Sequence, residues 1–281
     1  MTSAATDRTM VLVDRLAGTA IVLAALAAAA GLAVPDLYRD SDAWVRQARA
    51  ADLVTLLAVV PILAIGLRGA RAGSEAGRLA AFAALGYLAY NYGIFGFSVA
   101  INPMTPVHIA ILGLAVWALV LGAIAVARRP IGPGAGERLP RRTTAGFLLA
   151  VPALFALMWL GQIAASISSG VPPAALEAAG LPTNPVYTLD LAFALPFLAL
   201  AGTTLATRSR IGPPLALTAT GWAALMGFGI LAIFGFDAAA GAAVDASVAI
   251  LIGTITAIAV ALTAIGLLPA RHAPVQAAVT G

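Results

Sequence analysis

Long apolar runs alternate with short polar connections along the whole chain. The runs cover about 16–34, 51–67, 79–100, 106–127, 144–168, 184–202, 213–237 and 247–268. Most of these runs contain about 20 residues, the length an α-helix needs to cross the hydrocarbon core of a bilayer. The pattern therefore predicts an all-α, polytopic membrane protein with eight transmembrane helices.

Two pairs of short motifs recur at one constant offset in the chain. The first pair is Pro61-Ile-Leu-Ala64 and Pro196-Phe-Leu-Ala199, and the second is Gly86-Tyr87 and Gly221-Trp222. One shift that relates motifs in two successive apolar runs indicates a duplicated unit. With four spans in each unit, both halves have the same orientation, so we expect two parallel four-helix repeats rather than inverted ones.

A segment rich in Pro, Gly and Arg at 128–142 divides the chain at its midpoint. Such a composition is typical of a connection and not of a span. We therefore expect a first membrane unit at 1–127, a cytoplasmic linker at 128–142 and a second membrane unit at 143–281.

The first apolar run has two interpretations. Its alanine-rich end suits a signal-peptide cleavage site, whereas its length and its internal counterpart in the second half favour a retained helix. The polar connection at 35–50 follows it, and Ser41-Asp42 with Trp44 predicts a short interfacial helix there.

Composition supports the membrane assignment and excludes several kinds of chemistry. The chain is 61% hydrophobic and 10% charged, and every one of its 16 basic residues is Arg. Its mean hydropathy is +0.98, which excludes an ordinary soluble domain. Without Lys there is no Schiff base or phosphate-loop lysine, and without Cys there is no thiolate chemistry or disulfide. Two His residues, His108 and His272, do not suffice for an intramembrane bis-His haem, so we expect no cofactor.

The arginines predict the orientation of the protein. With cytoplasmic termini, 13 arginines lie in cytoplasmic segments and three lie outside. Short cytoplasmic loops carry an excess of positive residues, so we expect a multi-pass plasma-membrane protein with both termini cytoplasmic. The arginines then orient the chain in the lipid bilayer, and no nucleic-acid partner is expected.

Asp190 is the strongest functional candidate, because it lies inside an apolar run near Pro196. A carboxylate at membrane depth costs several kcal/mol unless it is paired or hydrated, and it therefore marks a functional position by default. A structural hydrogen bond to a neighbouring helix is the alternative role.

Several other polar residues fall at a similar depth in different spans. Tyr87, Asn91, Ser98 and Asn102 share one helical face in the third run. With Asp190 they suggest an outward-facing polar cavity, to which we assign Asp190, Asn91, Tyr87, Gln162, Asp52 and His108.

These additional residues also have structural explanations. Asp52 would be stabilised by a helix N-terminus and water, and His108 would lie at the membrane interface. Asn91 and Gln162 would hold helices together, and the tyrosines would pack. No metal-ligand cluster and no nucleophile motif is present in the sequence.

The segments Tyr90-Asn91-Tyr92 and Val186-Tyr-Thr-Leu-Asp-Leu191 resemble those of small multi-span membrane proteins of high-GC bacteria. This resemblance covers most of the chain and implies the same topology, without any particular activity.

The sequence favours a small-solute or proton-coupled transporter with Asp190 at its centre. One alternative is a membrane enzyme that acts on a lipid-linked substrate, with His108 and Asp190 as acid and base. Another is a sensor or scaffold subunit that binds a second membrane protein. Each requires a different partner: a small molecule, a lipid-linked substrate or a protein.

Overall fold

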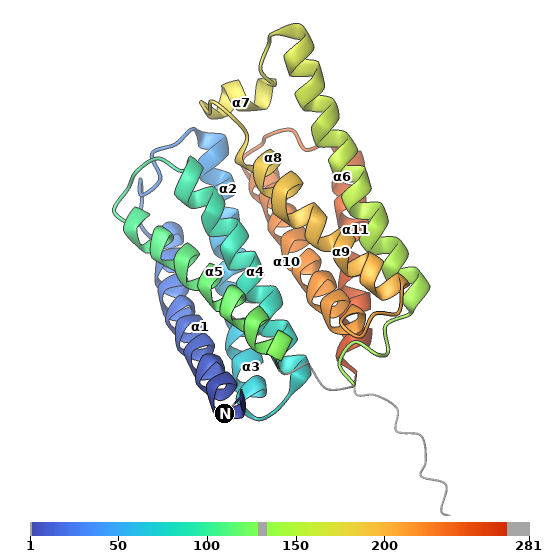
Figure 1. Ribbon diagram of the computed structural model, residues 1–281. Coiled ribbons are helices and arrows are strands. Elements are labelled where there is room, and N and C mark those ends of the chain that lie inside the picture. The colour runs from blue at the N-terminus through green and yellow to red at the C-terminus, as the bar shows by residue number, and fades with distance from the viewer. Residues whose placement is uncertain (1, 129–133, 269–281) are drawn as a thin grey trace, which may run out of the picture.

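The computed structural model describes residues 2–128 and 134–268 (Figure 1). Parts of the predicted linker and the segment that contains His272 lie outside these ranges. All regular secondary structure in the described residues is helical. The elements are α1 Thr2–Ala33, α2 Asp42–Val54, η1 Thr55–Val59, α3 Val60–Arg71, α4 Glu75–Ser98, α5 Thr105–Arg128, α6 Arg141–Ser169, α7 Ala174–Ala179, α8 Pro185–Leu189, η2 Asp190–Ala194, α9 Leu195–Ala206, α10 Gly212–Ala239 and α11 Ala246–Leu267.

Eight of the described helices are long and apolar enough to cross a membrane. They coincide with the eight apolar runs, and two of them combine several elements: Asp42–Arg71 contains α2, η1 and α3, and Pro185–Ala206 contains α8, η2 and α9. The prediction of an all-helical polytopic membrane protein is confirmed. α1 packs along α5 and buries small residues such as Ala17, Ala20 and Ala24, which favours the retained-helix interpretation.

The predicted interfacial helix is wrong. Residues from Asp42 onward belong to the continuous helix Asp42–Arg71, and the Ser41 side chain makes no capping hydrogen bond. The small residues Ala48, Ala50 and Ala51 are buried where α2 packs against α1 and α10. This packing explains why a segment with several arginines extends the span.

Each of the two composite spans contains one π-helical turn directly before a proline. The turns are Thr55–Val59 and Asp190–Ala194, and Pro61 and Pro196 lie in the first turn of the α-helix that follows. Proline has no N–H and collides with the preceding helical turn, and a wider π turn accommodates that conflict. The offset between the two π turns equals the offset between the two prolines.

The turn after α3 and the turn after α9 also have the same hydrogen bonds. Gly73 and Arg208 both adopt positive φ, at 85° and 59°. In the first turn the backbone N–H groups of Ala72, Gly73 and Ser74 donate to the carbonyl oxygens of Arg68, Ala70 and Gly69, respectively. In the second turn those of Thr207, Arg208 and Ser209 donate to the carbonyl oxygens of Thr203, Leu205 and Thr204. Every atom pair in the first turn corresponds to one in the second, at the same offset as the prolines.

Gly73→Ala is expected to destabilise the protein by about 1 kcal/mol, because an alanine at positive φ is strained. Nothing lies within 4 Å of the added methyl group, so the backbone conformation alone is responsible. Unfolding of the purified variant in micelles measures the effect. Gly235→Ala is the control, since that helical position is equally open and alanine is favoured there. Equal losses in both variants would contradict the explanation.

The helices form two groups that meet along α10. α3 and α5 both pack on α4 in the first group, and α9 and α11 both pack on α10 in the second, while α10 also packs against α2 and α4. Gly86 lies against Trp222 at the α4–α10 crossing, and Gly221 lies against Ala83. The groups differ in how their first helix packs: α1 packs along α5, whereas α6 packs along α9 and, as far as the structure describes these helices, not along α11.

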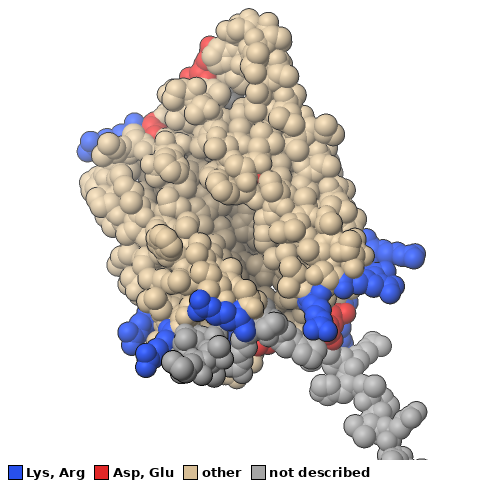
Figure 2. Space-filling view, viewed as in Figure 1, with Lys and Arg blue, Asp and Glu red and all other residues tan. Residues whose placement is uncertain are grey.

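Charged side chains lie mainly at the two ends of the molecule. Figure 2 shows a broad band nearly free of charge on the face it displays, with arginines concentrated at the end that holds the N-terminus. One ion pair at that end joins Arg71 to Asp14 over 3.0 Å. At the opposite end, Arg46 Nε donates to Asp237 Oδ1 at 2.6 Å and joins α2 to α10.

Candidate functional site

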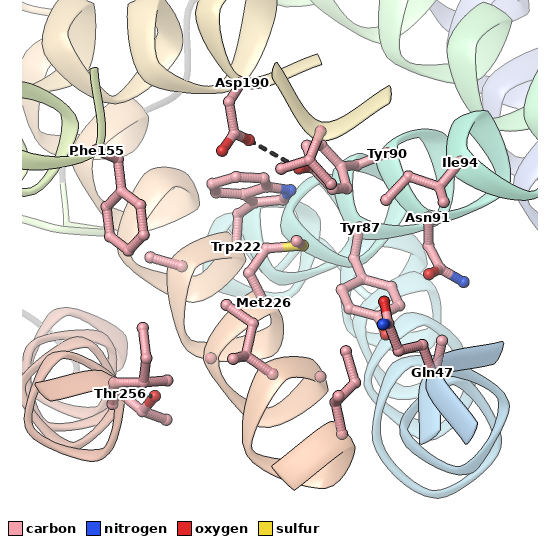
Figure 3. A pocket seen from close by; sticks show the side chains of 18 of the residues that line it. Gln47, Tyr87, Tyr90, Asn91, Ile94, Phe155, Asp190, Trp222, Met226 and Thr256 are labelled. Atoms are coloured by element: carbon pink, nitrogen blue, oxygen red, sulfur yellow. Dashed lines mark hydrogen bonds between the residues drawn. The ribbon is translucent and has the colours of Figure 1, made fainter. Parts of the chain in front are cut away.

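A pocket with a volume of about 220 Å³ lies between the two groups of helices. Its walls come from α2, α4, α6, α10 and α11 and from the composite span that contains η2. Figure 3 shows Tyr90, Asn91 and Gln47 on one side of this pocket, Phe155 and Thr256 on the other, and Asp190 at the top of the view between them. Asp190, Asn91 and Tyr87 from the predicted site therefore do line one space.

Asp190 is held by one hydrogen-bond donor from each half of the chain. Tyr90 Oη in α4 donates to Asp190 Oδ1 at 2.7 Å, and Trp159 Nε1 in α6 donates to Asp190 Oδ2 at 2.7 Å. Asp190 is 8% exposed. The carboxyl group thus points into the protein and links α4 of the first half to α6 of the second.

Local sequence explains how Asp190 reaches this position. Asn184 caps α8 by accepting a hydrogen bond from Val186 N at 2.9 Å, and Pro185 occupies the first turn. Asp190 is the first residue of the π turn that precedes Pro196. A π turn changes the direction of the side chains that follow it relative to an α-helix, and such turns are frequent at functional sites.

The pocket is largely apolar, which differs from the polar cavity that the sequence suggested. Aliphatic and aromatic side chains form most of the lining, including Ile94, Leu198, Trp222, Met226 and Ile230. Apolar residues separate the polar ones on the same helical faces. The polar groups are therefore concentrated in only part of the wall.

Gln162 does not line the pocket. It is exposed, and its Oε1 accepts a hydrogen bond from Tyr187 Oη at 2.5 Å. The Tyr187 ring also packs against Trp159, with ring centroids 5.0 Å apart. Gln162 therefore joins α6 to α8 near the site, in agreement with its structural explanation.

Asp52 forms a separate buried site in the first half. Its Oδ2 accepts a hydrogen bond from Tyr38 Oη at 2.6 Å, and the residue is 1% exposed. Burial raises the pKa of Tyr38 well above its ordinary value, and the charge of Asp52 adds to this, so the phenol stays protonated and donates. The expected position in a solvated first helical turn is wrong, because the helix begins at Asp42 and Asp52 lies well inside it.

His108 is also outside the pocket. It is 1% exposed, and its ring lies 4.9 Å from Phe95 and 5.6 Å from Tyr92, measured between centroids. His108 does lie in the first turn of α5, but aromatic rings enclose its imidazole. The acid–base pair of His108 and Asp190 that a membrane enzyme would use receives no support from this arrangement.

The predicted polar face of the third span is shorter than expected. α4 ends at Ser98, so Asn102 lies in the turn before α5. There, Asn102 Oδ1 accepts from Met104 N at 2.8 Å, and Thr105 Oγ1 accepts from Asn102 N at 2.9 Å. Asn102 shapes this turn and does not extend the site.

Three aromatic residues of the site were not predicted as functional. Tyr90 and Trp159 bind Asp190, and the Trp222 ring lies 5.8 Å from the Tyr90 ring in an edge-to-face arrangement. The sequence favoured packing roles because aromatic residues are common in apolar spans. A usable signal was present: Tyr and Trp carry polar hydrogens that need acceptors when buried, and Asp190 was the available intramembrane acceptor.

Comparisons with protein-family models, with curated proteins and with solved structures find no match for this chain.

Proposed function

We propose that this protein is a proton-coupled transporter for a small molecule, with Asp190 as the coupling carboxylate. The substrate binds in the pocket between two repeated halves, which move relative to each other and open the pocket to either side of the membrane. The single observation that carries the proposal is the pair of hydrogen bonds that Asp190 accepts from Tyr90 and Trp159, one from each half.

The charge state of Asp190 affects these two hydrogen bonds differently. An ionised carboxylate accepts from both donors, whereas a protonated one also carries a hydrogen that needs an acceptor. The Tyr90 hydroxyl can rotate and accept it, but the indole N–H of Trp159 can only donate. Protonation at Oδ1 therefore keeps both contacts, whereas protonation at Oδ2 weakens the acceptor of the Trp159 bond, and in that second state the position of α6 becomes linked to the proton.

α6 is suited to such a movement. It is the least buried of the eight described spans, and its main partner is α9. Of the three pocket-lining residues in α6, namely Val151, Phe155 and Trp159, only Trp159 hydrogen bonds to Asp190. A shift of α6 along α9 would therefore change one wall of the pocket.

Repetition of the two halves supports the proposal, because many transporters consist of repeats with a binding site at the interface between them. The equal spacing of the π turns and the matching hydrogen bonds after α3 and α9 both favour a duplication. So does the α4–α10 crossing, where Gly86 and Gly221 have the same offset as the two prolines. We infer two parallel repeats, the second more open than the first between its outer helices.

The distribution of arginines supports a plasma-membrane orientation with both termini in the cytoplasm. The start of α1, the end of α3 and the start of α6 would then be cytoplasmic, and the connection between α1 and α2 would face outward (Figure 1).

Cysteine labelling tests the proposal directly, because the chain contains no native cysteine. Ala48→Cys places a reporter in the pocket lining, where the native side chain is 4% exposed. A membrane-impermeant maleimide is applied to either face of oriented vesicles at acidic and at neutral pH. We expect labelling from the outer face to dominate at one pH and labelling from the inner face at the other.

Asp36→Cys and Ala72→Cys are the matched controls for sidedness, since both positions are exposed and lie at opposite ends of the molecule. Each should react from one face only at both pH values. A pocket reporter that reacts from only one face at every pH, or from neither, would overturn alternating access.

A further inference from the structure

Building on the proposed function, we propose that the transported molecule is a lipophilic organic cation, an amine or quaternary ammonium with an apolar body. The cationic centre would lie beside Asp190 among the aromatic rings, and the apolar body would contact the aliphatic side of the pocket.

The charge of the described lining favours a cation. Asp190 is its single ionisable residue at neutral pH, and none of the lining residues is an arginine. The hydrogen bonds from Tyr90 and Trp159 orient the carboxylate but bring no positive charge. A buried charge requires a counter-charge or a proton, and a bound cation supplies the first.

Aromatic rings surround the same carboxylate. Tyr90, Trp159, Trp222 and Phe155 all line the pocket, and the rings of Phe155 and Trp159 lie 6.3 Å apart between centroids. The faces of such rings attract cations, most strongly for Trp and after removal of water. A small neutral polar solute would leave most of this wall without a suitable contact.

Exchange between a proton and the cation keeps the pocket neutral. When the pocket is empty, Asp190 holds a proton on Oδ1 that the Tyr90 oxygen accepts, so that Oδ2 still accepts from Trp159. When the cation binds, that proton leaves to the solvent and the carboxylate pairs with the cation. Either state avoids an uncompensated charge at membrane depth. The exchange of one proton for one cation therefore gives the coupling that the proposed function requires.

The route into the pocket is consistent with a lipophilic substrate. Residues of α6 and α11 both line the pocket, although these helices, as described, do not pack along each other. Figure 3 shows Phe155 of α6 and Thr256 of α11 on the same side of the pocket. The separation of these helices offers a lateral entrance from the bilayer.

Benzyltrimethylammonium and its neutral isostere neopentylbenzene test the charge preference. Binding to the full-length protein in nanodiscs is followed by tryptophan fluorescence, and proton release is measured calorimetrically in two buffers of different ionisation enthalpy. With both Kd values expressed per mole of lipid, we expect the cation to bind at least about tenfold more tightly than the isostere, with release of about one proton. In Asp190→Asn we expect the preference and the proton release to disappear, while Glu177→Gln, an exposed acid outside the pocket, retains both.

Comparison of parent and variant within the same nanodiscs cancels the partitioning of each probe into lipid. Equal or tighter binding of the neutral isostere by the parent, on the same scale per mole of lipid, would overturn the cation proposal, as would an unchanged preference in Asp190→Asn. If the isostere binds more tightly than the cation while labelling of the Ala48→Cys reporter still changes from one face to the other with pH, the cation proposal fails and the proposed function stands. If the cation binds but the reporter reacts from one face only, the proposed function fails instead.

Discussion

Asp190→Asn is expected to leave the protein folded and to abolish the pH dependence of labelling at Ala48→Cys. Asparagine preserves the local contacts, because its oxygen can accept from Trp159 and its NH₂ group can donate to the Tyr90 oxygen. It removes the proton that distinguishes the two states. The ratio of outer-face labelling rates at acidic and at neutral pH should therefore fall to about one, since protons no longer bind the two states differently.

Asp190→Leu separates this effect from loss of structure. Leucine leaves the Tyr90 hydroxyl and the Trp159 indole N–H without their acceptor, and we expect the free energy of unfolding to fall by about 1 to 4 kcal/mol. Trp159→Phe removes only the donor in α6 and should cost less. If Asp190→Asn lowers stability as much as Asp190→Leu, or keeps its pH-dependent labelling, the coupling role of the carboxyl group is contradicted.

Gly31→Ala is expected to produce the largest loss of stability among single alanine substitutions in α1. The added methyl group would overlap with Asp52 Oδ2 and would also collide with the Tyr38 hydroxyl oxygen. Accommodating it requires the buried pair to separate or α1 to shift, at a cost of about 3 kcal/mol. Unfolding in micelles measures this loss.

Gly18→Ala provides the matched control in the same helix, because nothing lies within 4 Å of the added group. It should be neutral or slightly stabilising, since alanine is the better helix former. Tyr38→Phe should reproduce part of the Gly31→Ala loss by removing the hydrogen bond while leaving the helices in place. A Gly31→Ala protein as stable as Gly18→Ala would mean that the Tyr38–Asp52 pair is not packed against α1.

The spans were predictable because lipid imposes a simple requirement on the chain. A bilayer demands about 20 apolar residues with an internally hydrogen-bonded backbone, and both features are local in sequence. The boundaries were less predictable. Asp42 to Ala50 is polar enough to suggest a surface helix, and only the packing of its alanines against α1 and α10 shows that it continues the span.

The site was predictable only in part, for an equally physical reason. Asp190 is conspicuous in sequence because its burial is costly, and Tyr87 and Asn91 follow from one helical face. Asp52 and His108 have the same polar character, yet they point into the first group of helices. Depth in the membrane can be counted along a helix, but the direction of each side chain depends on which helices become neighbours.

The separation of α6 and α11 determines how any affinity of this pocket for a lipophilic molecule must be interpreted. A ligand that enters laterally equilibrates first between water and lipid, and the protein meets it at its concentration in the bilayer. Each additional CH₂ group favours transfer out of water by about 0.8 kcal/mol, whatever it contacts in the pocket. A homologous series will therefore show aqueous Kd values that decrease with chain length, and only Kd values expressed per mole of lipid will report the selectivity of the pocket.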